Sequence, residues 1–562
     1  MKNIYRLLAL CICAALCVCM MAGCGSSSTT TEEAAPAADA AAAPAAADDG
    51  EYKVFKYGAD ANSTTFDPYA DLQTKSGSAL CHSVGETLWT LDSDGNVIFN
   101  KLATGYELSE AEVVATASGE ASGEASGEAS EEASGELTTE LMITVTLRDG
   151  VTFSNGNAFT SDDVLYTLEH MAATSRTSSM VTGIDFGNTY CPDDTTIVIA
   201  MSAYDAAFIP MLGGANNIIL DRETCEADPE FSWLVGTGPY VLSNWEESVA
   251  YTLTRNENYW GDAPYYDEID ICFYSNESTL YSDFQVGNLD AAYLTESTYI
   301  NNVANGAAGD AVLIQRAQNS VNGFSMAISD STKATLSDVN IRLAIAHALD
   351  IETMVESIGE GVYLPADSVL TETSWAYESQ GVYSYDPELA AQYLAEAGYS
   401  VDNPLTISLV AEGTSFQSAM AEAAQAYLAA IGINLDISGM GDFATILPLL
   451  IAGDMDMSIG SPSSESSSDP AALLQQLGPN SDNDLLRIED EAVAGLFTQA
   501  ASSQDQAERT ELYYQFQEAV NEQCLFIPIW IGTLNYAVQS QHTSFESALD
   551  ANNTFDPCLL TD

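Results

Sequence analysis

Basic residues and histidine are scarce in this sequence. Its 15 lysines and arginines face 82 aspartates and glutamates, and with the four histidines neutral the formal net charge is −67 at pH 7. Proteins that bind the phosphate backbone of nucleic acids need basic patches, so this composition excludes nucleic acid as a partner. The acids are spread along the chain and salt screens most of their field. We therefore interpret them as favouring solubility, with attraction of cationic solutes as the alternative.

Signatures of catalysis and of metal binding are also absent. The sequence has no Gly-x-Ser-x-Gly, no His-Glu-x-x-His and no glycine-rich phosphate loop, so neither an enzyme nor a bound cofactor is expected. Cys81 and His82 are adjacent but have no companion ligands, and His170 and His347 fall on predicted helices among apolar residues. Beyond residue 24 there is no Cys-x-x-Cys pair, so no metal site is predicted.

A single long apolar run lies at the start of the chain. Two basic residues precede the apolar residues 7–21, which lead into Ala22-Gly23-Cys24. These features predict a secretory signal over residues 1–23, too short for a comfortable transmembrane helix. The surroundings of Cys24 resemble the bacterial lipobox, which implies that Cys24 is diacylated and becomes the first residue of the mature protein. Residues 24–50, rich in small residues and acids, are predicted to form a flexible linker.

The remaining cysteines are scattered through the body of the chain. They are Cys81, Cys191, Cys225, Cys272, Cys524 and Cys558. Export permits disulfides, but the spacing of six cysteines does not determine how they would pair. The alternative is that some or all of them are small buried apolar residues.

Short strands alternate with helices after the linker, which indicates an α/β architecture. Alternating apolar residues predict a strand over 141–147, and Asp386 is placed to cap a helix. A helix over Ser418–Ala430 ends at Gly432, and an alternating strand follows over 433–437.

Two polar segments interrupt this pattern. Leu91 to Val97 contains Asp and Gly at its centre and predicts a hairpin turn. Residues 117–136 repeat Ala-Ser-Gly-Glu, a composition too polar and too rich in glycine to pack, and are predicted to form a disordered loop inserted in a hairpin.

Several sequence blocks, taken in order, resemble one known family. The stretch Leu147-Arg148-Asp149-Gly150-Val151-Thr152-Phe153 is followed by Thr160-Ser161-Asp162-Asp163-Val164. The later blocks are Gly236-Thr237-Gly238-Pro239-Tyr240, Arg255-Asn256-Glu257-Asn258-Tyr259-Trp260, Asp338 to Asp350, Tyr385 to Tyr399, and Ile527-Pro528-Ile529. Together they resemble the extracellular solute-binding proteins of family 5, the peptide-, dipeptide- and nickel-binding components of ABC importers. The resemblance runs from about residue 53 to the C-terminus, interrupted by the Ala-Ser-Gly-Glu repeat.

The resemblance implies a two-lobed α/β fold of the periplasmic-binding-protein type, in its large class II peptide-binding form with an extra subdomain. The first lobe would cover residues 51–320, the second lobe 321–519, and the chain would return to the first lobe over 520–562. Ligand contacts on both lobes exist only in the closed form, so binding favours closure. The protein is expected to be an exported monomer, held by its lipid at the outer face of the bacterial cell membrane, that delivers ligand to the permease subunits of an ABC transporter.

The resemblance also marks candidate ligand-binding residues. Ser63, Thr64 and Phe66 lie in a loop that lines the cleft in relatives. Trp375 and Tyr377 fall where relatives carry an aromatic cleft segment. Each group has an alternative, since ordinary loop polarity would give the first and packing of aromatic rings would give the second.

Two further segments belong to the candidate site. Thr414, Ser415 and Phe416 follow a predicted strand, at a position that contacts ligand in relatives. Some dipeptide-binding relatives carry an arginine there that pairs with a substrate carboxylate, and this chain has none.

The stretch Ser461–Pro470 resembles the family loop that ends in Asp-Pro or Glu-Pro. In peptide binders an aspartate three residues before that pair captures the amino group of the peptide. Here that position is Ser466, and the adjacent Glu465 is an anionic alternative. Asp469 is either a ligand contact or a cap before Pro470. We therefore expect capture of short peptides. The alternatives are a sugar, osmolyte or metal chelate as the solute, or a surface receptor for peptide signals.

Overall fold

The computed structural model describes residues 52–562 apart from fifteen short or medium segments. The segments outside the description are 60–66, 72–74, 93, 115–136, 175–176, 215–216, 229–233, 247, 327–333, 442–444, 447–448, 450–455, 462–468, 475–490 and 551–552. The predicted signal, Cys24, the linker and the Ala-Ser-Gly-Glu repeat therefore lie outside the described residues. Among the helices that are described, none is long and apolar enough to cross a membrane.

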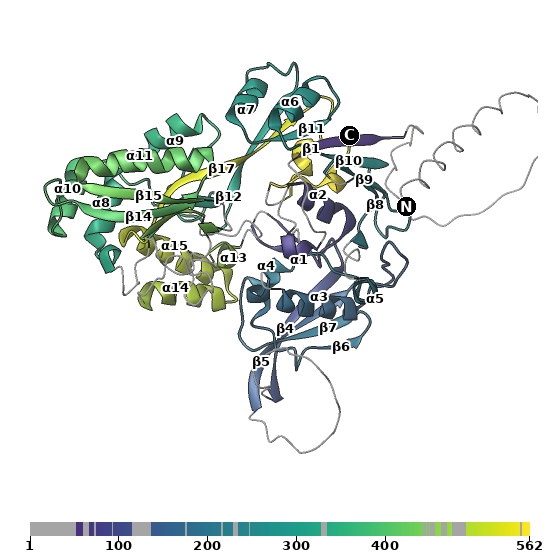
Figure 1. Cartoon of the computed structure of the whole chain (residues 1–562). Coiled ribbons are helices and arrows are strands. Elements are labelled where there is room, and N and C mark those ends of the chain that lie inside the picture. Colours follow the sequence, from purple (N-terminus) through teal and green to yellow (C-terminus); the bar gives the residue numbers. More distant parts are fainter. Residues whose placement is uncertain are drawn as a thin grey trace, which may run out of the picture. The chain divides into compact units, whose positions relative to one another are not determined.

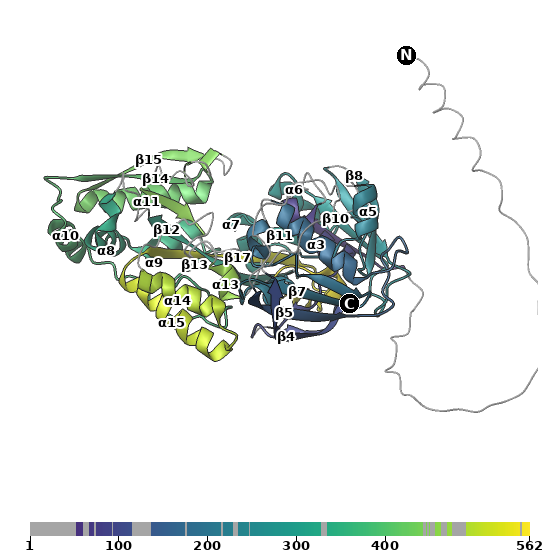
Figure 2. The same cartoon turned by 90° about the horizontal axis from the view of Figure 1, so that it is seen from below.

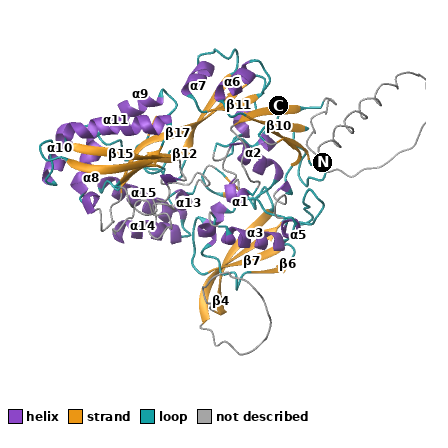
Figure 3. Ribbon diagram, in the orientation of Figure 1, coloured by secondary structure: helices purple, strands orange, loops and turns teal. Residues whose placement is uncertain are grey.

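Strands and helices alternate along the described chain, as the sequence predicts (Figure 3). The strands are β1 (Val54–Ala59), β2 (Thr90–Leu91), β3 (Val97–Ile98), β4 (Ala103–Val114), β5 (Leu137–Leu147), β6 (Tyr190–Asp193), β7 (Thr196–Met201), β8 (Tyr240–Glu246), β9 (Ala250–Arg255), β10 (Glu268–Phe273), β11 (Ala291–Leu294), β12 (Val312–Met326), β13 (Leu364–Pro365), β14 (Leu405–Glu412), β15 (Ile433–Gly441), β16 (Met457–Gly460) and β17 (Phe526–Val538). The helices are α1 (Pro68–Asp71), α2 (Lys75–Val84), α3 (Ser161–Ala173), α4 (Phe208–Met211), α5 (Arg222–Ala227), α6 (Glu277–Gln285), α7 (Ser297–Ala304), α8 (Val339–Ala348), α9 (Ile351–Gly359), α10 (Pro387–Glu396), α11 (Ser415–Ile431), α13 (Pro470–Leu473), α14 (Glu491–Ser502) and α15 (Gln506–Glu522).

The main sheet is shared by two groups of strands, in the order β15-β14-β16-β12-β17-β11-β1-β10-β9-β8. We call β1 and β8 to β11 the first-lobe strands, and β14 to β16 the second-lobe strands. The long strands β12 and β17 run side by side between the two groups (Figures 1 and 2). One part of β12 pairs with β16, while the end of β17 pairs with β11. The chain thus passes from one lobe to the other along β12 and returns along β17.

A separate four-stranded antiparallel sheet, in the order β4-β5-β7-β6, belongs to the small subdomain, which we define as the described residues from Thr90 to Ala227. Its strand β5 carries the predicted alternation, and Ile143, Val145 and Leu147 lie in a core cluster. The pairing of β4 with β5 continues to Val114 and Leu137. The Ala-Ser-Gly-Glu repeat therefore connects the two strands of a hairpin, as predicted, although the repeat itself is not described.

Helices cover the second-lobe strands on both faces (Figure 1). Residues of α8 to α11 form one core cluster with β14, β15 and β16, and residues of α14 and α15 form another with Phe526 at the start of β17. The predicted start of α11 at Ser418 is wrong by three residues, because Thr414 caps the helix and it begins at Ser415. The predicted cap of α10 is confirmed, because Asp386 accepts hydrogen bonds from the first turn of that helix. Likewise, Gly432 ends α11 in the left-handed conformation, with φ of 100°.

The glycines of the Gly-Thr-Gly block have a packing role in the first lobe. A Cβ on Gly236 would lie 2.1 Å from the carbonyl oxygen of Val84, and one on Gly238 would lie 2.6 Å from that of Ser83. The Gly238 amide donates to the Val84 oxygen at 2.9 Å. Only glycine permits this close approach of the chain to the end of α2.

Another family-like block surrounds a buried carboxylate. Glu86 is 2 % exposed, and it accepts hydrogen bonds from Trp260 Nε1 at 2.6 Å and Tyr259 Oη at 3.0 Å. Burial raises the pKa of Glu86, whereas Lys101, 3.8 Å away, and the hydrogen bonds lower it. The Arg148 guanidinium lies over the Trp260 ring, 4.2 Å from its centroid. These motif residues therefore build the interior of the protein.

Candidate ligand-binding site

The carboxyl ends of three parallel strands meet at one edge of the second lobe. Strand β14 runs parallel to β15, with Glu412 opposite Gly441, and parallel to β16 on its other side. Ligands of open α/β sheets bind at the carboxyl ends of the strands. Thr414, Ser415 and Phe416 come directly after β14 and open α11, so the structure places these three predicted residues at this edge.

The first two of these residues present polar groups. Thr414 is the N-cap of α11, and its hydroxyl accepts a hydrogen bond from the Gln417 amide at 3.2 Å. Thr414 and Ser415 are both exposed. The N-terminal turn of a helix leaves amide groups without helical partners, which suits it to bind polar or anionic groups of a ligand.

Phe416 belongs to a group of three aromatic rings that sequence reasoning did not assemble. Its ring stacks on Tyr363 with centroids 3.9 Å apart and meets Trp530 edge-on at 5.2 Å. Tyr363 directly precedes β13, and Trp530 lies in β17 and is 3 % exposed. The signal for Trp530 was its position next to the Ile527-Pro528-Ile529 block. Tyr363 carried no local signal.

The predicted aromatic segment around Tyr377 is tied to the rest of the second lobe. The Tyr377 hydroxyl donates to Asp367, with distances of 2.9 and 3.0 Å to the two carboxylate oxygens. Burial and this hydrogen bond raise the pKa of Tyr377 to about 12. Gln517 of α15 donates to the carbonyl of Ala376 at 2.8 Å and accepts from Ser368 at 2.8 Å. These bonds attach the segment to Asp367 and to α15.

Trp375 is half-buried and touches three different parts of the chain. The Arg509 guanidinium lies 5.0 Å from its ring centroid, and the Tyr513 ring meets it edge-on at 6.0 Å. On another side is Gly95 of the turn between β2 and β3, where an added Cβ would come within 2.9 Å of the indole. Most of the Trp375 side chain therefore packs against other residues of the protein.

Asp469 is 3 % exposed, and its carboxylate has protein partners. It pairs with Arg509 Nη2 at 2.7 Å and accepts from the Ala471 amide at 2.9 Å, at the start of α13. Burial raises the pKa of Asp469, and Arg509 opposes that shift. This geometry favours the cap interpretation over the direct ligand contact, and Asp469 fixes the chain directly after the family-like loop.

Ser63, Thr64, Phe66, Glu465 and Ser466 fall outside the described residues. In the sequence, the first three follow β1 and the last two follow β16.

The arginines described in the second lobe are used inside the protein. Arg342 donates to the carbonyl groups of Leu336 at 2.8 Å and of Gln523 at 2.8 Å, and Arg509 pairs with Asp469. Neither guanidinium is presented to a ligand carboxylate in the described part of this lobe. This agrees with the absence of arginine from the Thr414–Phe416 segment.

None of the six body cysteines forms a disulfide. Cys81, Cys225 and Cys524 are buried, and burial raises the pKa of Cys81 and of Cys524 to about 12. They behave as small apolar residues, the second of the two interpretations that the sequence leaves open. Within the described residues, no group of three or more His, Cys, Asp and Glu side chains could hold a metal ion.

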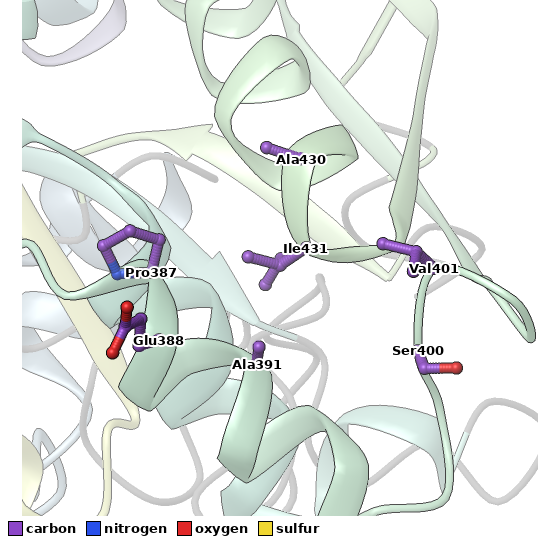
Figure 4. Close-up of a pocket in the computed structure, with 7 residues that line it drawn as sticks. All are labelled: Pro387, Glu388, Ala391, Ser400, Val401, Ala430 and Ile431. Atoms are coloured by element: carbon purple, nitrogen blue, oxygen red, sulfur yellow. The ribbon is translucent and has the colours of Figure 1, made fainter.

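One surface pocket of about 300 Å³ lies elsewhere in the second lobe (Figure 4). It is lined by Pro387, Glu388, Ala391, Ser400, Val401, Ala430 and Ile431. Ala430 and Ile431 are at the C-terminal end of α11, a helix of 17 residues that begins at Ser415. At 1.5 Å per residue, the pocket lies about 25 Å from the N-terminal end of that helix. It is separate from the candidate ligand-binding site.

The strands β12 and β17 connect the two lobes, and the candidate site lies next to them at the carboxyl edge of β14 to β16. This arrangement is that of a two-lobed solute-binding protein. Residues 132–484 match the family model for bacterial extracellular solute-binding proteins, family 5. The chain belongs to this family.

Relatives and solved structures agree with this assignment. The chain is 28% identical to heme-binding protein A of Haemophilus influenzae over 352 residues, which are 60% of this chain and 63% of that protein. It is 22% identical to the periplasmic oligopeptide-binding protein OppA of Salmonella typhimurium over 426 residues, 69% of this chain and 76% of the relative. The structure of DppA from Helicobacter pylori in complex with the peptide STSA superposes with a TM-score of 0.70 at 21% identity, covering 91% of this chain and 98% of DppA.

Family membership confirms four of the predictions from sequence. These are the family itself, the two-lobed α/β fold, the role as an exported solute-binding component of an ABC importer, and the assignment as a binding protein rather than an enzyme. The lipid anchor, the lobe boundaries, the monomeric state and the ligand-binding residues stay predictions.

Proposed function

We propose that this protein captures short peptides between its two lobes and delivers them to the permeases of an ABC importer, while a lipid on Cys24 holds it at the membrane. The observation that carries the proposal is the position of Thr414, Ser415 and Phe416. They lie at the carboxyl edge of β14 to β16, next to the strands that join the lobes. OppA and the peptide-bound DppA support peptide as the ligand.

The strands that join the lobes also have a feature suited to bending. The pairing of β12 with β17 is irregular between Ala317 and Val321, and again between Asn322 and Gly323. Such irregularities leave groups unpaired and bend strands locally. A ligand that contacts both lobes would be bound most tightly when the strands bend toward closure, so binding would shift the population to the closed form.

The chemistry of the described site favours main-chain recognition of a peptide. The hydroxyls of Thr414 and Ser415, the amides in the first turn of α11 that Thr414 does not cap, and the ring of Phe416 can hold an extended backbone without a charged partner. Glu465 and Ser466 follow β16 in the sequence, and we propose that they bind the amino group of the peptide. We propose that Trp375, Tyr377 and Asp469 hold the site in place through contacts with other residues of the protein. Ser63, Thr64 and Phe66 are proposed to contact the ligand from the first lobe.

Calorimetry against di- to pentapeptides, with sugars and osmolytes as the comparison set, tests the proposal. Peptides should bind, and Phe416→Ala should raise the Kd at least about fivefold, as is usual for a central aromatic contact. The matched control is Tyr427→Ala, because Tyr427 is a half-buried aromatic residue of the same helix α11, far from its N-terminal end.

Two results would count against the proposal. Binding to sugars or osmolytes without binding to any peptide would reject peptide as the ligand class. Equal losses of affinity in Phe416→Ala and Tyr427→Ala would show that the carboxyl edge of β14 is not the site.

A further inference from the structure

The small subdomain is joined to the second lobe by two hydrogen bonds. Neither bond involves the residues Thr414 to Phe416 at the carboxyl edge of β14. The Ala206 amide, just before α4, donates to the carbonyl of Ala501 at the end of α14, at 2.7 Å. The Gln506 side-chain amide, in the first turn of α15, donates to the carbonyl of Asp94 at 3.0 Å. Asp94 lies in the turn between β2 and β3, so two separate loops of the subdomain reach the same helix pair.

Apolar packing accompanies these bonds. Gly95, with φ of 78°, lies so close to the Trp375 indole that a Cβ there would come within 2.9 Å of Cδ1 and Nε1. Ala207 packs against the core cluster that contains Tyr513 and Phe516 of α15. Ala207 of the small subdomain thus forms part of a hydrophobic core of the second lobe.

Charged groups surround the same contact. Asp205 accepts a hydrogen bond from the Ala207 amide at 2.9 Å. Burial raises the pKa of Asp205, and the charge of Asp469 raises it further, while the Ala207 bond and Arg509 lower it. Arg509 is shared between Asp469 and the ring of Trp375. Trp375 therefore lies where the subdomain turn, the ion pair and α15 come together. We name this set of interactions the docking contact.

We propose that the docking contact is an additional tie between the lobes, formed without ligand. The strands β12 and β17 alone would allow the second lobe to swing freely about their irregular pairing. Ser297 and Asn301 of α7 also donate to Glu360 of the second lobe beside these strands. The docking contact adds a connection through the small subdomain, which restricts the motion of the lobes further. This role is independent of the chemical identity of the solute.

Hydrogen exchange of the full chain without ligand, followed by mass spectrometry, tests the proposal. Ala206 lies in a loop and is 2 % exposed, so its amide would be protected by burial and by the bond to Ala501. We expect it to exchange at least about 100-fold more slowly than an unstructured amide. Gln506→Ala should accelerate that exchange about threefold to tenfold, the usual effect of losing one hydrogen bond. The matched control is Gln515→Ala, an exposed glutamine of the same helix whose side chain bonds Glu511 within α15.

A second pair of variants tests the packing part independently. Gly95→Ala forces a Cβ against Trp375, whereas Gly150→Ala has nearly the same φ, 77°, with nothing within 4 Å of the added Cβ. Exchange at Ala206 should increase in Gly95→Ala and stay unchanged in Gly150→Ala. The docking contact would be overturned if the Ala206 amide is unprotected in the parent protein. It would also be overturned if Ala206 exchanges equally fast in Gln506→Ala and Gln515→Ala and equally fast in Gly95→Ala and Gly150→Ala. These measurements use no peptide, so failure of the peptide proposal would leave their outcome unaffected.

Discussion

Loss of Arg509 should produce a large and pH-dependent loss of stability. Its Nη2 lies 2.7 Å from Asp469 Oδ1, and the two side chains are 10% and 4% exposed. Breaking a buried pair by removing one partner leaves an uncompensated charge, which costs about 3–5 kcal/mol at neutral pH. Arg509→Met keeps an apolar side chain of similar length, so most of that cost comes from the Asp469 carboxylate, which loses its cationic partner.

The sign of the pH dependence follows from the pKa of Asp469. Burial raises that pKa and Arg509 opposes the shift, so removing Arg509 raises it further. A carboxyl group whose pKa is raised in the folded state destabilises the protein as the pH rises through that pKa, and the penalty disappears below the unfolded value of about 3.9. The difference in unfolding free energy between the parent and Arg509→Met should therefore shrink from pH 7 toward pH 4.

Urea denaturation at both pH values measures this difference. The control is Arg222→Met, because Arg222 and Glu226 form an (i, i+4) pair with side chains 43% and 56% exposed, and such pairs contribute only about 0.3–0.5 kcal/mol. Adding Asp469→Asn to Arg509→Met should remove the pH-dependent part of the loss. A loss below about 1 kcal/mol at pH 7, or one that grows toward acid, would refute the reasoning.

Two further predictions concern the anchor and the second-lobe core. Cys24→Ser should release the protein from the membrane fraction into the soluble fraction while leaving its affinity for peptide unchanged, and continued membrane association on fractionation would argue against lipidation. Gly432→Ala should lower the unfolding free energy by about 2–4 kcal/mol, because its φ is 100° and an added Cβ would lie 2.5 Å from the Ser400 backbone. Gly398→Ala, with φ of 91° and nothing within 4 Å, should cost only about 1 kcal/mol; equal losses in the two variants would show that the close approach is unimportant.

Local chemistry made parts of the fold predictable. The N-cap at Asp386 and the glycine that ends α11 act within one or two turns of chain, so the sequence contains all the atoms involved. The hairpin turn before Val97 was equally readable, because Asp92 accepts hydrogen bonds from the Asp94 and Asn96 amides of the same turn. The strand before Thr414 was also predicted, whereas α11 begins three residues before the predicted Ser418, so Ser415 and Phe416 lie in its first turn.

Contacts between distant residues were not predictable in the same way. Trp375 was expected to contact ligand because aromatic residues occupy this position in relatives, and no local pattern shows that Gly95 lies against its ring. Asp469 and Arg509 are 40 residues apart in sequence, and neither has a neighbour that signals the pair. The stack of Tyr363 on Phe416 likewise depends on the way β13 joins β17. Such contacts depend on tertiary packing and cannot be read from periodicity.

The use of basic residues connects the composition to ligand recognition. The described lysines and arginines each have an internal partner: Lys53 and Lys75 lie over tyrosine rings, Arg148 lies over Trp260, Arg342 bonds carbonyl groups, and Lys56, Lys101, Arg222, Arg255, Arg316 and Arg509 pair with acids. The scarce cations of this part of the chain therefore stabilise the fold. A ligand at the proposed site, the described carboxyl edge of β14 to β16, would be recognised by hydroxyls, aromatic rings and backbone amides. A peptide carboxylate bound there would be met by the amides at the start of α11, since a helix N-terminus supplies positive potential without a basic side chain.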